Sequence, residues 1–410
     1  YDFFLFGTAS ALVFNALFFS DASETTATLA SFATLGVGFL ARPFGAILFG
    51  QIGDRMGRRP ALLISIVAIG VATGLIGLLP NYNSIGIWAP IALTVLRLVQ
   101  GIAVGGEWGG ATTMAIEHAP AEKRGRYAAF VQIGSPAGTL LSSGVFSLIL
   151  MLPDDAVSSW GWRIPFLIAF PFLAIALYIR TKVEESPVYQ ALEKEAEEDE
   201  AKHKGSLKEL FTEHFGQIVL AAAAALLGIG GFFVLTTYTI SYATITLNFE
   251  RQTVVNATLA AAVCQIFINL YFGRLGEKIG PGKVMGWGGI ATAVMAYPIW
   301  AMIDSGNAAL LTVAVCLGLS LVTSTYSVSG VLLSEIFPAN VRYSGVAIAA
   351  NIAGAISGLL PFIATAMNAS NETPSSIPGV IILVTISLIT ALGSFWAERH
   401  RRTDDVVVKD

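Results

Sequence analysis

Long apolar runs constrain this chain more than any other feature. Short polar connections separate twelve such runs, which cover residues 1–19, 27–50, 60–80, 88–113, 126–152, 162–181, 216–246, 253–274, 283–303, 308–333, 343–367 and 377–397. Each run has about the ~20 residues that an α-helix needs to cross a bilayer. None shows the alternating pattern of an outer-membrane β-barrel strand. The sequence therefore predicts an all-α membrane protein with twelve transmembrane helices.

The composition agrees with a membrane environment. Of the 410 residues, 54% are hydrophobic and 13% are charged, whereas about 25% of the residues in a soluble domain are charged. The net charge of -4 gives no reason to expect a nucleic-acid partner. Cys264 and Cys316 lie inside apolar runs, so we interpret them as small buried hydrophobic residues and predict neither a disulfide framework nor a metal site.

The start of the chain and the distribution of its cations predict its orientation. Tyr1 opens inside an apolar run without the flanks of a signal peptide, so we expect that an N-terminal tail precedes it. If the first helix begins in the cytoplasm, nearly all Lys and Arg residues of the connections lie inside, and the outer connections contain only Arg163 and Arg251. We therefore expect a multi-pass protein of the plasma (inner) membrane, a monomer in the lipid bilayer, with both termini cytoplasmic.

One polar interruption divides the twelve runs into six and six. We predict an N-terminal six-helix bundle at 1–181, a cytoplasmic linker at 182–214, a C-terminal six-helix bundle at 215–398 and a cytoplasmic tail at 399–410. The linker has few apolar residues and an acidic centre, so a solvated helical linker is the simplest interpretation. A partner-binding role for the linker is the alternative.

The second half repeats polar signatures of the first. GQIGDRMG at 50–57 returns as GRLGEKIG at 273–280, and a second pattern places Glu117 and Arg124 against Glu335 and Arg342 at nearly the same offset. These echoes indicate two pseudo-repeated six-helix bundles that rock around a central site.

The first of these signatures predicts a gate. Its glycines allow helices to approach closely, and Asp54 can accept hydrogen bonds from Arg58 or from a helix N-terminus. We interpret the motif as a latch at the cytoplasmic face that closes in one conformation and breaks in the other. In the alternative interpretation, its arginines only enforce the topology. The predicted gating residues are Gly50, Gly53, Asp54, Arg55, Gly57, Arg58, Arg59, Glu117, Arg124, Gly273, Glu277, Lys278, Glu335 and Arg342.

These motifs resemble a known family. The pattern G-x-x-x-D-R-x-G-R-R at 50–59, its degenerate copy at 273–280 and RLVQGIAVGGEWGG at 97–110 are similar to signatures of the major facilitator superfamily. YDFFLFGTASALVF, ARPFGAILFGQIGDRMGRRP and GWRIPFLIAF resemble, more closely, its metabolite:proton symporter family. That resemblance implies the major facilitator fold and the transport of citrate, 2-oxoglutarate, shikimate, dicarboxylates, proline or betaines. The helix 5 sequence GSPAG at 134–138 departs from the antiporter pattern, which favours symport.

Four charged residues of the predicted helices are singled out, Asp2, Arg42, Arg97 and Glu107, because charges within a membrane span usually face a cavity or a partner. At a rise of ~1.5 Å per residue, Asp2, Arg42 and Glu107 lie roughly 26, 24 and 28 Å from the outer ends of their helices and so share one level. Arg97 lies roughly 13 Å from the outer end of its helix, nearer the midplane.

Proton coupling requires a group that changes charge, and all four histidines fall at the cytoplasmic side. Burial favours a protonated carboxyl and a neighbouring arginine favours the carboxylate, so an embedded acid can load and release a proton as its surroundings alternate. By resemblance, a helix 1 Asp and a helix 4 Arg play these parts. We predict coupling by Asp2 first and Glu107 second, with Arg97 and Arg42. Static ion pairs such as Asp2–Arg42 are the alternative.

The resemblance places helices 1, 4, 7 and 10 around the substrate cavity. Arg97 has a planar fork suited to a carboxylate, which favours an organic anion, although tyrosines beside an Asp could bind a quaternary ammonium. Each polar residue could instead stabilise helix packing. The predicted substrate-binding residues are Tyr1, Asn15, Arg97, Gln100, Gln132, Tyr238, Tyr242, Gln265, Tyr326 and Asn351, with Ser324 and Asn269 as further candidates.

The sequence thus predicts a secondary active transporter that takes up a small polar metabolite with protons by alternating access. The favoured substrate is a di- or tricarboxylate or a shikimate-like anion. A proline or betaine symporter and an uncoupled facilitator are the alternatives. No nucleophile or metal constellation indicates an enzyme, so we expect no cofactor beyond protons as the coupling ion.

Overall fold

The computed structural model describes residues 1–56, 58–105, 107, 115, 119–182, 207–338, 341–369 and 374–402. Eight helical segments in this part of the chain are long and apolar enough to cross a membrane. They are Glu24–Phe49, Gly161–Tyr178, Phe215–Ile245, Arg251–Ile279, Pro281–Asp304, Ala308–Ile336, Ser344–Ala369 and Ile377–Arg399. Leu63–Leu78 and Trp88–Val104 are shorter apolar helices. The first and fifth predicted spans each consist of two consecutive helices.

The N-terminal half contains the first six spans. Its helices are α1 (Asp2–Leu12), α2 (Phe14–Phe18), α3 (Glu24–Leu40), α4 (Arg42–Met56), α5 (Arg58–Leu78), α6 (Tyr82–Ile85), α7 (Trp88–Val104), η1 (Ala121–Lys123), α9 (Arg124–Gln132), α10 (Gly134–Ile149), α11 (Asp154–Ser159), η2 (Gly161–Arg163), α12 (Ile164–Leu167) and α13 (Ala169–Lys182).

The C-terminal half contains the other six spans. Its helices are α15 (Leu207–Glu213), α16 (Phe215–Phe233), the π-helical turn η3 (Val234–Tyr238), α17 (Thr239–Ile245), α18 (Arg251–Ile279), α19 (Pro281–Asp304), α20 (Ala308–Tyr326), α21 (Ser329–Ile336), α22 (Arg342–Ala369) and α23 (Ile377–Arg399). All regular structure in the described residues is helical, which confirms the predicted all-α membrane fold. The bundle limits 1–181 and 215–398 stay predictions.

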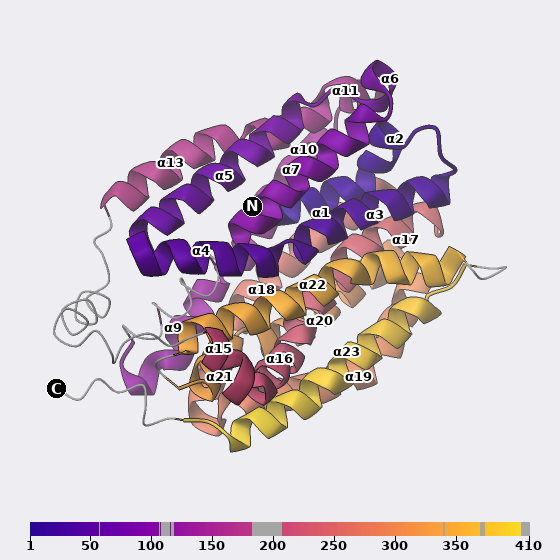
Figure 1. The fold of residues 1–410 in the computed structure, drawn as a ribbon. Coiled ribbons are helices and arrows are strands. Elements are labelled where there is room, and N and C mark those ends of the chain that lie inside the picture. The colour runs from indigo at the N-terminus through magenta and orange to yellow at the C-terminus, as the bar shows by residue number, and fades with distance from the viewer. Residues whose placement is uncertain are drawn as a thin grey trace.

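The long helices run roughly side by side between two ends of the molecule (Figure 1). We name the end with α15, α21 and the start of α9 the linker face. The opposite end, with α6, α11 and residues 19–23, is the loop face. The helices coloured indigo to magenta lie mostly in one half of the view, and those coloured orange to yellow lie mostly in the other (Figure 1).

The first, second and seventh spans are irregular inside the bundle. Pro43 cannot donate a backbone hydrogen bond to the preceding turn, and its ring crowds that turn, which accounts for the break between α3 and α4 at Ala41. The first span breaks at Val13, and the seventh widens into η3 between α16 and α17. Such π-helical turns are frequent at functional sites.

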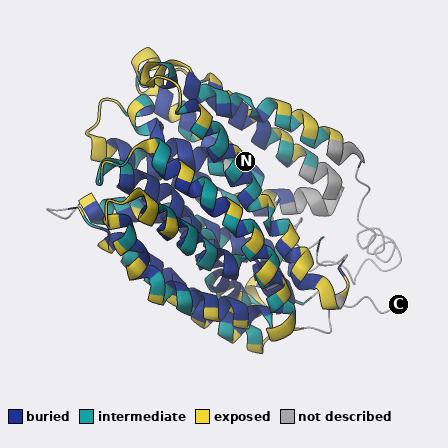
Figure 2. Cartoon of the chain, turned by 180° about the vertical axis from the view of Figure 1, so that it is seen from behind, coloured by how far each residue is buried: buried dark blue, intermediate teal, exposed yellow. Residues whose placement is uncertain are grey.

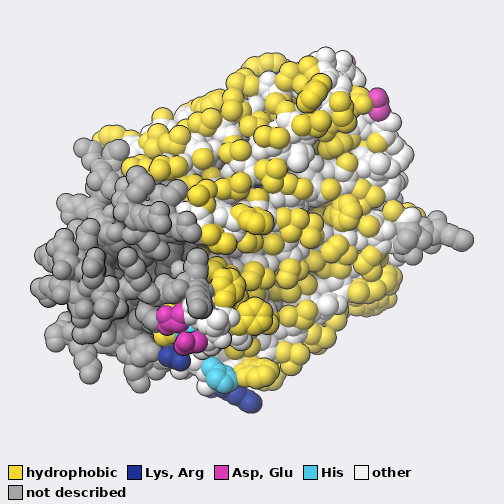
Figure 3. Space-filling view, viewed as in Figure 1, with side chains coloured by type: hydrophobic (Ala, Val, Ile, Leu, Met, Phe, Trp, Pro, Cys, Tyr) yellow, Lys and Arg dark blue, Asp and Glu magenta, His cyan; other side chains and the backbone are white. Residues whose placement is uncertain are grey.

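The surface between the two faces is apolar. Large side chains such as Phe44, Phe267 and Leu392 are exposed there, and Figure 3 shows hydrophobic atoms over most of the visible side of the molecule. Buried residues line the inner sides of the helices (Figure 2). A soluble protein rarely exposes so large an apolar surface, whereas a bilayer solvates it. The packing therefore agrees with a membrane protein.

Candidate functional site

The centre of the candidate site is a buried arginine. Arg97 is on α7 and only 3% exposed, and its guanidinium carbon lies 4.3 Å from the ring centre of Phe6 and 5.8 Å from that of Phe39. Its Nη1 donates to Gln100 Oε1 at 3.1 Å, and Gln100 Nε2 donates to Thr73 Oγ1 at 2.6 Å. Arg97 Nε and Nη2 are buried and have no hydrogen-bond partner in the described part of the chain.

Glycines hold this arginine against the second span. A Cβ atom at Gly38 would lie 2.3 Å from Arg97 Nε, and one at Gly101 would lie 1.9 Å from the carbonyl oxygen of Gly38. A Cβ at Gly45 would likewise lie 1.9 Å from the carbonyl oxygen of Ile102. Only glycine permits such close contact between helices. The sequence analysis did not identify these glycines. Glycines four or seven residues apart lie on one face of a helix, and this spacing could have indicated a close contact between neighbouring helices.

A second buried cation lies beside the first. The guanidinium carbon of Arg42 lies 4.3 Å from the ring centre of Phe39, and Arg42 interacts electrostatically with Arg97 and Tyr326. Cation–π contacts compensate part of the cost of burying such charges. The structure thus brings Arg42 and Arg97 together around one phenylalanine, which makes the site strongly cationic.

The two predicted coupling acids come from different spans: Asp2 begins α1, and Glu107 belongs to the fourth span. The backbone nitrogen of Tyr1, the residue that precedes Asp2 and is the N-cap of α1, shows where this helix begins. A Cβ atom placed on Gly138, near the middle of the fifth span, would lie 2.9 Å from that nitrogen. Asp2 is therefore well inside the bundle, one helical turn from Phe6, on which Arg97 stacks. No described carboxylate forms a salt bridge with Arg97, so the predicted link between Asp2 and Arg97 is not a direct contact here.

Several predicted substrate-binding residues are held within the N-terminal half. Tyr1 donates its hydroxyl hydrogen to the carbonyl oxygen of Pro165 at 2.5 Å, and its ring packs edge-on against Phe172. Asn15 accepts a hydrogen bond from the backbone of Ala16. The hydrogen bonds of Tyr1 and Asn15 thus go to Pro165 and Ala16, whereas Gln100 bonds to Arg97 directly.

The helix 7 tyrosines belong to a network inside the C-terminal half. Tyr242 donates to Asp304 Oδ1 at 2.9 Å, and Ser376 donates to the other oxygen of that carboxylate. Tyr238 accepts from Asn368 Nδ2 at 3.3 Å. The two tyrosine rings stack at 5.9 Å, and both contact Trp300. These contacts give both tyrosine hydroxyls hydrogen-bond partners close to the loop face. The sequence analysis did not identify Asp304 or Ser376 as members of this network.

Buried amides lie where the fifth and eighth spans pack together. Gln265 Nε2 donates to Thr323 Oγ1 at 2.8 Å, and Asn269 Nδ2 donates to the carbonyl oxygen of Gln265. Gln265 Oε1, Asn269 Oδ1 and Gln132 Nε2 are buried and lack partners in the described residues. Ser324 only bonds locally to the carbonyl oxygen of Leu321. The amides of Gln132 and Gln265 thus keep unused hydrogen-bonding capacity.

Asn351 and Tyr326 lie where the halves meet. Asn351 Nδ2 donates at 2.8 Å to the carbonyl oxygen of Gly105 on the fourth span and to that of Ala347. Tyr326 ends α20 beside Gly228 and interacts with Arg42 across the halves. Both residues connect the C-terminal half to the cationic site.

The linker face is closed by contacts between the halves. Arg126 on α9 donates from its backbone nitrogen and from Nε to the Glu277 carboxylate on α18, at 2.9 and 3.0 Å. A Cβ at Gly273 would lie 2.5 Å from that of Ala129, so this glycine allows α9 and α18 to touch. Two predicted gating residues, Gly273 and Glu277, therefore lie in one contact.

A buried acid forms the second part of this gate. Glu335 on α21 lies 3.9 Å from Arg124 Nη1 of the other half and 2.6 Å from Arg401 Nε. Arg401 also binds Glu398 at 2.7 Å. Burial alone would lower the pKa of Arg401, but the charges of Glu335 and Glu398 and their hydrogen bonds raise it above its ordinary value. Sequence analysis predicted Arg124 and Glu335 but missed Arg126, Glu398 and Arg401.

The structure describes the remaining predicted gating residues only in part. Gly57 and Glu117 lie outside the described residues, as do the side chains of Asp54, Arg55, Arg58 and Arg59 and the surroundings of Gly50 and Gly53. Lys278 is exposed at the end of α18. Arg342 donates from Nε to the carbonyl oxygen of Ser334 at 2.9 Å.

The two cysteines depart from their interpretation as buried residues. Both are free and half-buried, Cys264 on α18 and Cys316 on α20. In the described part of the chain, Glu209 and Glu213 of α15 and His214, which follows that helix, also place their potential ligand atoms within 4.8 Å of one another. Residues four positions apart lie on one face of a helix, so such a group arises without any ligand.

The comparisons with known proteins agree with this architecture. A family model described as sugar (and other) transporter matches residues 1–208. The inner membrane metabolite transport protein YhjE of Escherichia coli (strain K12) is 36% identical, covering 89% of this chain and 83% of that protein. The shikimate transporter of the same strain is 36% identical, covering 90% and 84%. The proline/betaine transporter of Salmonella typhimurium is 32% identical, covering 96% and 80%.

Solved structures show the same fold at lower sequence identity. The crystal structure of a D-xylose-proton symporter has a TM-score of 0.69 at 21% identity and covers 98% of this chain and 97% of its own. The proton:xylose symporter XylE bound to 6-bromo-6-deoxy-D-glucose has a TM-score of 0.71 at 18% identity, covering 99% and 96%.

Proposed function

Because this chain belongs to the sugar (and other) transporter family of the major facilitator superfamily, we propose that it carries a small organic anion across the membrane by proton-coupled symport. As a member of that family it is a membrane transporter of small molecules and not an enzyme. The proposal concerns the substrate class, the coupling ion and the orientation in the membrane.

The observation that carries the proposal is the unused hydrogen-bonding capacity of Arg97. Its buried Nε and Nη2 groups lack partners in the described chain, and an unsatisfied charged donor is costly to bury. A carboxylate binds a guanidinium through two parallel hydrogen bonds. Arg42, close by, adds a second positive charge. An organic anion would therefore satisfy this site, whereas a neutral sugar would leave its charge uncompensated.

The placement of Asp2 on α1, the helix that also carries Phe6, supports proton coupling. Phe6, which supports the Arg97 guanidinium, is one turn of α1 from Asp2. A shift of α1 during the conformational change would move the acid and the substrate-binding arginine together. In this proposal Asp2 takes the proton, Glu107 is the second candidate, and no cofactor takes part.

Alternating access requires the gate at the linker face to break. The Arg126–Glu277 and Arg124–Glu335 pairs join the two halves there. We assign the linker face to the cytoplasm of a cell whose inner membrane holds the protein, with both termini on that side, because the cations of the connections gather there. In that orientation, the pairs close the inward path and separate when substrate is released.

A proline or betaine symporter is the second candidate, since relatives at 32% identity carry those names. Arg97 would bind their carboxylate as well. A quaternary ammonium, however, needs an accessible aromatic face. In the cluster of Tyr238, Tyr242 and Trp300 the rings cover one another, which favours the anion.

The test is a counterflow screen with purified protein in proteoliposomes. Di- and tricarboxylates, a shikimate-like hydroxy acid, proline and betaines are offered with and without an imposed pH gradient. We expect counterflow of an organic acid, and its accumulation under a proton gradient, which a protonophore abolishes. Counterflow of proline or betaine alone would reject the anion assignment, and accumulation that ignores the gradient would reject proton coupling.

Variants of Arg97 test whether this residue binds the substrate that the screen identifies. Arg97→Ala should raise the half-saturation concentration about 10- to 150-fold, because hydrogen bonds to a charged group contribute about 1.5–3 kcal/mol. Arg97→Lys keeps the positive charge but not the planar set of N–H donors, so it should recover part of the lost substrate affinity. Arg251→Ala, which removes an exposed arginine at the start of α18, is the control. Wild-type affinity in Arg97→Ala would contradict the assigned role.

Asp2→Asn tests the coupling step separately. Without a titratable carboxyl, substrate exchange should continue while accumulation driven by protons is lost. Asp155→Asn, an exposed acid on α11 at the loop face, serves as the matched control. If Asp2→Asn accumulates substrate as the unmodified protein does, another group titrates, and Glu107→Gln is then measured in the same assay.

A further inference from the structure

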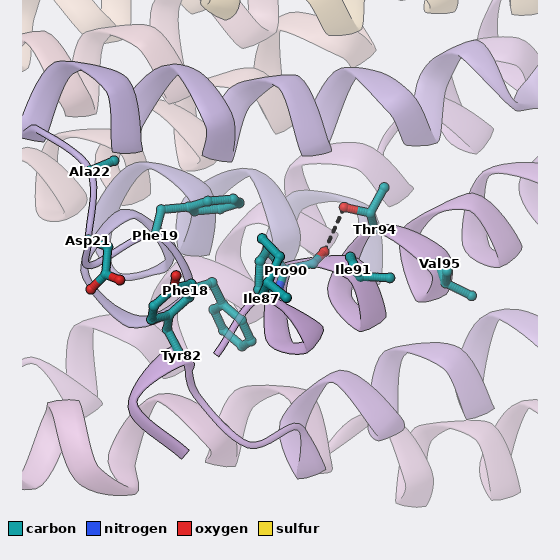
Figure 4. Close-up of a pocket in the computed structure, with 10 residues that line it drawn as sticks. All are labelled: Phe18, Phe19, Asp21, Ala22, Tyr82, Ile87, Pro90, Ile91, Thr94 and Val95. Carbon is teal, nitrogen blue, oxygen red and sulfur yellow. Dashed lines mark hydrogen bonds between the residues drawn. The ribbon is translucent and has the colours of Figure 1, made fainter. Parts of the chain in front are cut away.

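A groove lies on the side of the N-terminal half, near the loop face. It has a volume of about 500 Å³ and is enclosed by the end of α2, by α6 and by the first turns of α7. Figure 4 shows Phe19, Ile87, Ile91 and Val95 along it, with Asp21 and Tyr82 near one end. The groove is separate from Arg97 and takes no part in the proposed transport site.

The wall formed by α7 is open to the hydrocarbon of the bilayer. Ile87, Ile91 and Val95 are 59%, 43% and 51% exposed, and their spacing of four residues places them in one stripe along the helix. Thr94 also lines the groove, but its hydroxyl donates to the carbonyl oxygen of Pro90 at 2.8 Å. The groove is therefore an apolar trough that runs along the helix into the membrane.

The end of the trough carries a negative charge. Asp21 is exposed in the connection between α2 and α3, and none of the described cations forms a salt bridge with it. The Asp21 carboxylate lies beside the Tyr82 hydroxyl, and its proximity and charge raise the pKa of Tyr82. No Lys or Arg precedes Arg42 in the sequence, and none lies between Arg59 and Arg97. A carboxylate and a phenol thus face solvent where lipid headgroups lie.

We propose that this groove is a binding site for phosphatidylethanolamine, with one acyl chain in the trough and the headgroup ammonium on Asp21. An acyl chain gains little by leaving the equally apolar bilayer for the trough, so the headgroup must supply the selectivity. A primary ammonium donates to a carboxylate and to the Tyr82 oxygen. A choline headgroup has no N–H to donate, and Asp21 repels an anionic headgroup.

The experiment compares lipids that share acyl chains. The purified full chain is mixed with equal amounts of phosphatidylethanolamine, phosphatidylcholine and phosphatidylglycerol, and the retained lipids are counted by native mass spectrometry. We expect one firmly retained phosphatidylethanolamine, held at least fivefold better than the other two. Asp21→Asn should remove this preference. Asp155→Asn, which also removes one exposed acid at the loop face, should keep it.

A second variant tests the trough independently of the charge. Ile91→Trp places a larger side chain on an exposed apolar position, so the helix should tolerate it while the trough becomes too narrow for an acyl chain. Retention of phosphatidylethanolamine should then fall although Asp21 is intact. Equal retention of the three lipids by the unmodified protein would overturn the proposal. So would an unchanged preference in Asp21→Asn, or full retention in Ile91→Trp.

Discussion

Replacing Glu335 should open the linker face of this transporter. Glu335 lies 3.9 Å from Arg124 of the other half and 2.6 Å from Arg401 of its own half, with a side chain only 4% exposed. Glu335→Gln keeps the shape of the side chain but removes the charge that both arginines face. The closed gate then leaves Arg124 beside a neutral amide, whereas the open gate allows water to hydrate it.

The size of the effect follows from the distance and the burial. At about 4 Å and an effective dielectric constant of about 20, two unit charges attract by about 4 kcal/mol. Desolvation of the charges offsets much of this gain. We therefore expect the closed state to lose about 1–3 kcal/mol, which shifts the ratio of open to closed molecules by roughly 5- to 150-fold.

A cysteine at the interface reports on that ratio. Ala128 on α9 packs against Val331 on α21 and is 1% exposed, so a thiol at this position reacts only when the halves separate. Cys264 and Cys316 are the only native cysteines and are first replaced by serine. The rate at which a maleimide labels Ala128→Cys from the linker side is then compared with and without Glu335→Gln.

The matched control removes a neighbouring carboxylate that does not face the other half. Glu398 binds Arg401 and the backbone nitrogen of Gly282, all within the C-terminal half. Glu398→Gln should change the labelling rate by less than about twofold. An unchanged rate in Glu335→Gln, or an equal increase in Glu398→Gln, would refute the view that Glu335 holds the halves together.

Three further predictions test packing and support of the site. Gly101→Ala should destabilise the protein by about 1–3 kcal/mol in thermal unfolding, because its Cβ would stand 1.9 Å from a backbone oxygen of α3, whereas Gly134→Ala, with open space around it, should be neutral. Asp304→Asn should speed hydrogen exchange in α17, because the bond from Tyr242 loses its charged acceptor. Gln100→Leu should raise the half-saturation concentration of the anion about tenfold in counterflow, because Gln100 orients Arg97.

The sequence alone determined that this chain is an all-α membrane protein with two related halves. An apolar run of ~20 residues in a bilayer must satisfy its own backbone hydrogen bonds, and a helix does so within one segment. The repeated polar motifs selected Glu277, Arg124 and Glu335, and the structure places all three in contacts between the halves. Charged groups in apolar helices are so costly that Arg97 and Asp2 could be selected from their type and depth alone.

Only the tertiary structure decided which partner each of these residues meets. Helices that are apolar all round give no periodic signal for the face that contacts a neighbour, so the sequence did not reveal that Tyr242 bonds to Asp304 or that Arg126 pairs with Glu277. Helix approach at single glycines sets those partners. The contact of Gly38 with Arg97 places the guanidinium between phenylalanine rings without a described carboxylate partner. The sequence located this charge, but the arrangement on which we base the proposed anion site came only from the tertiary structure.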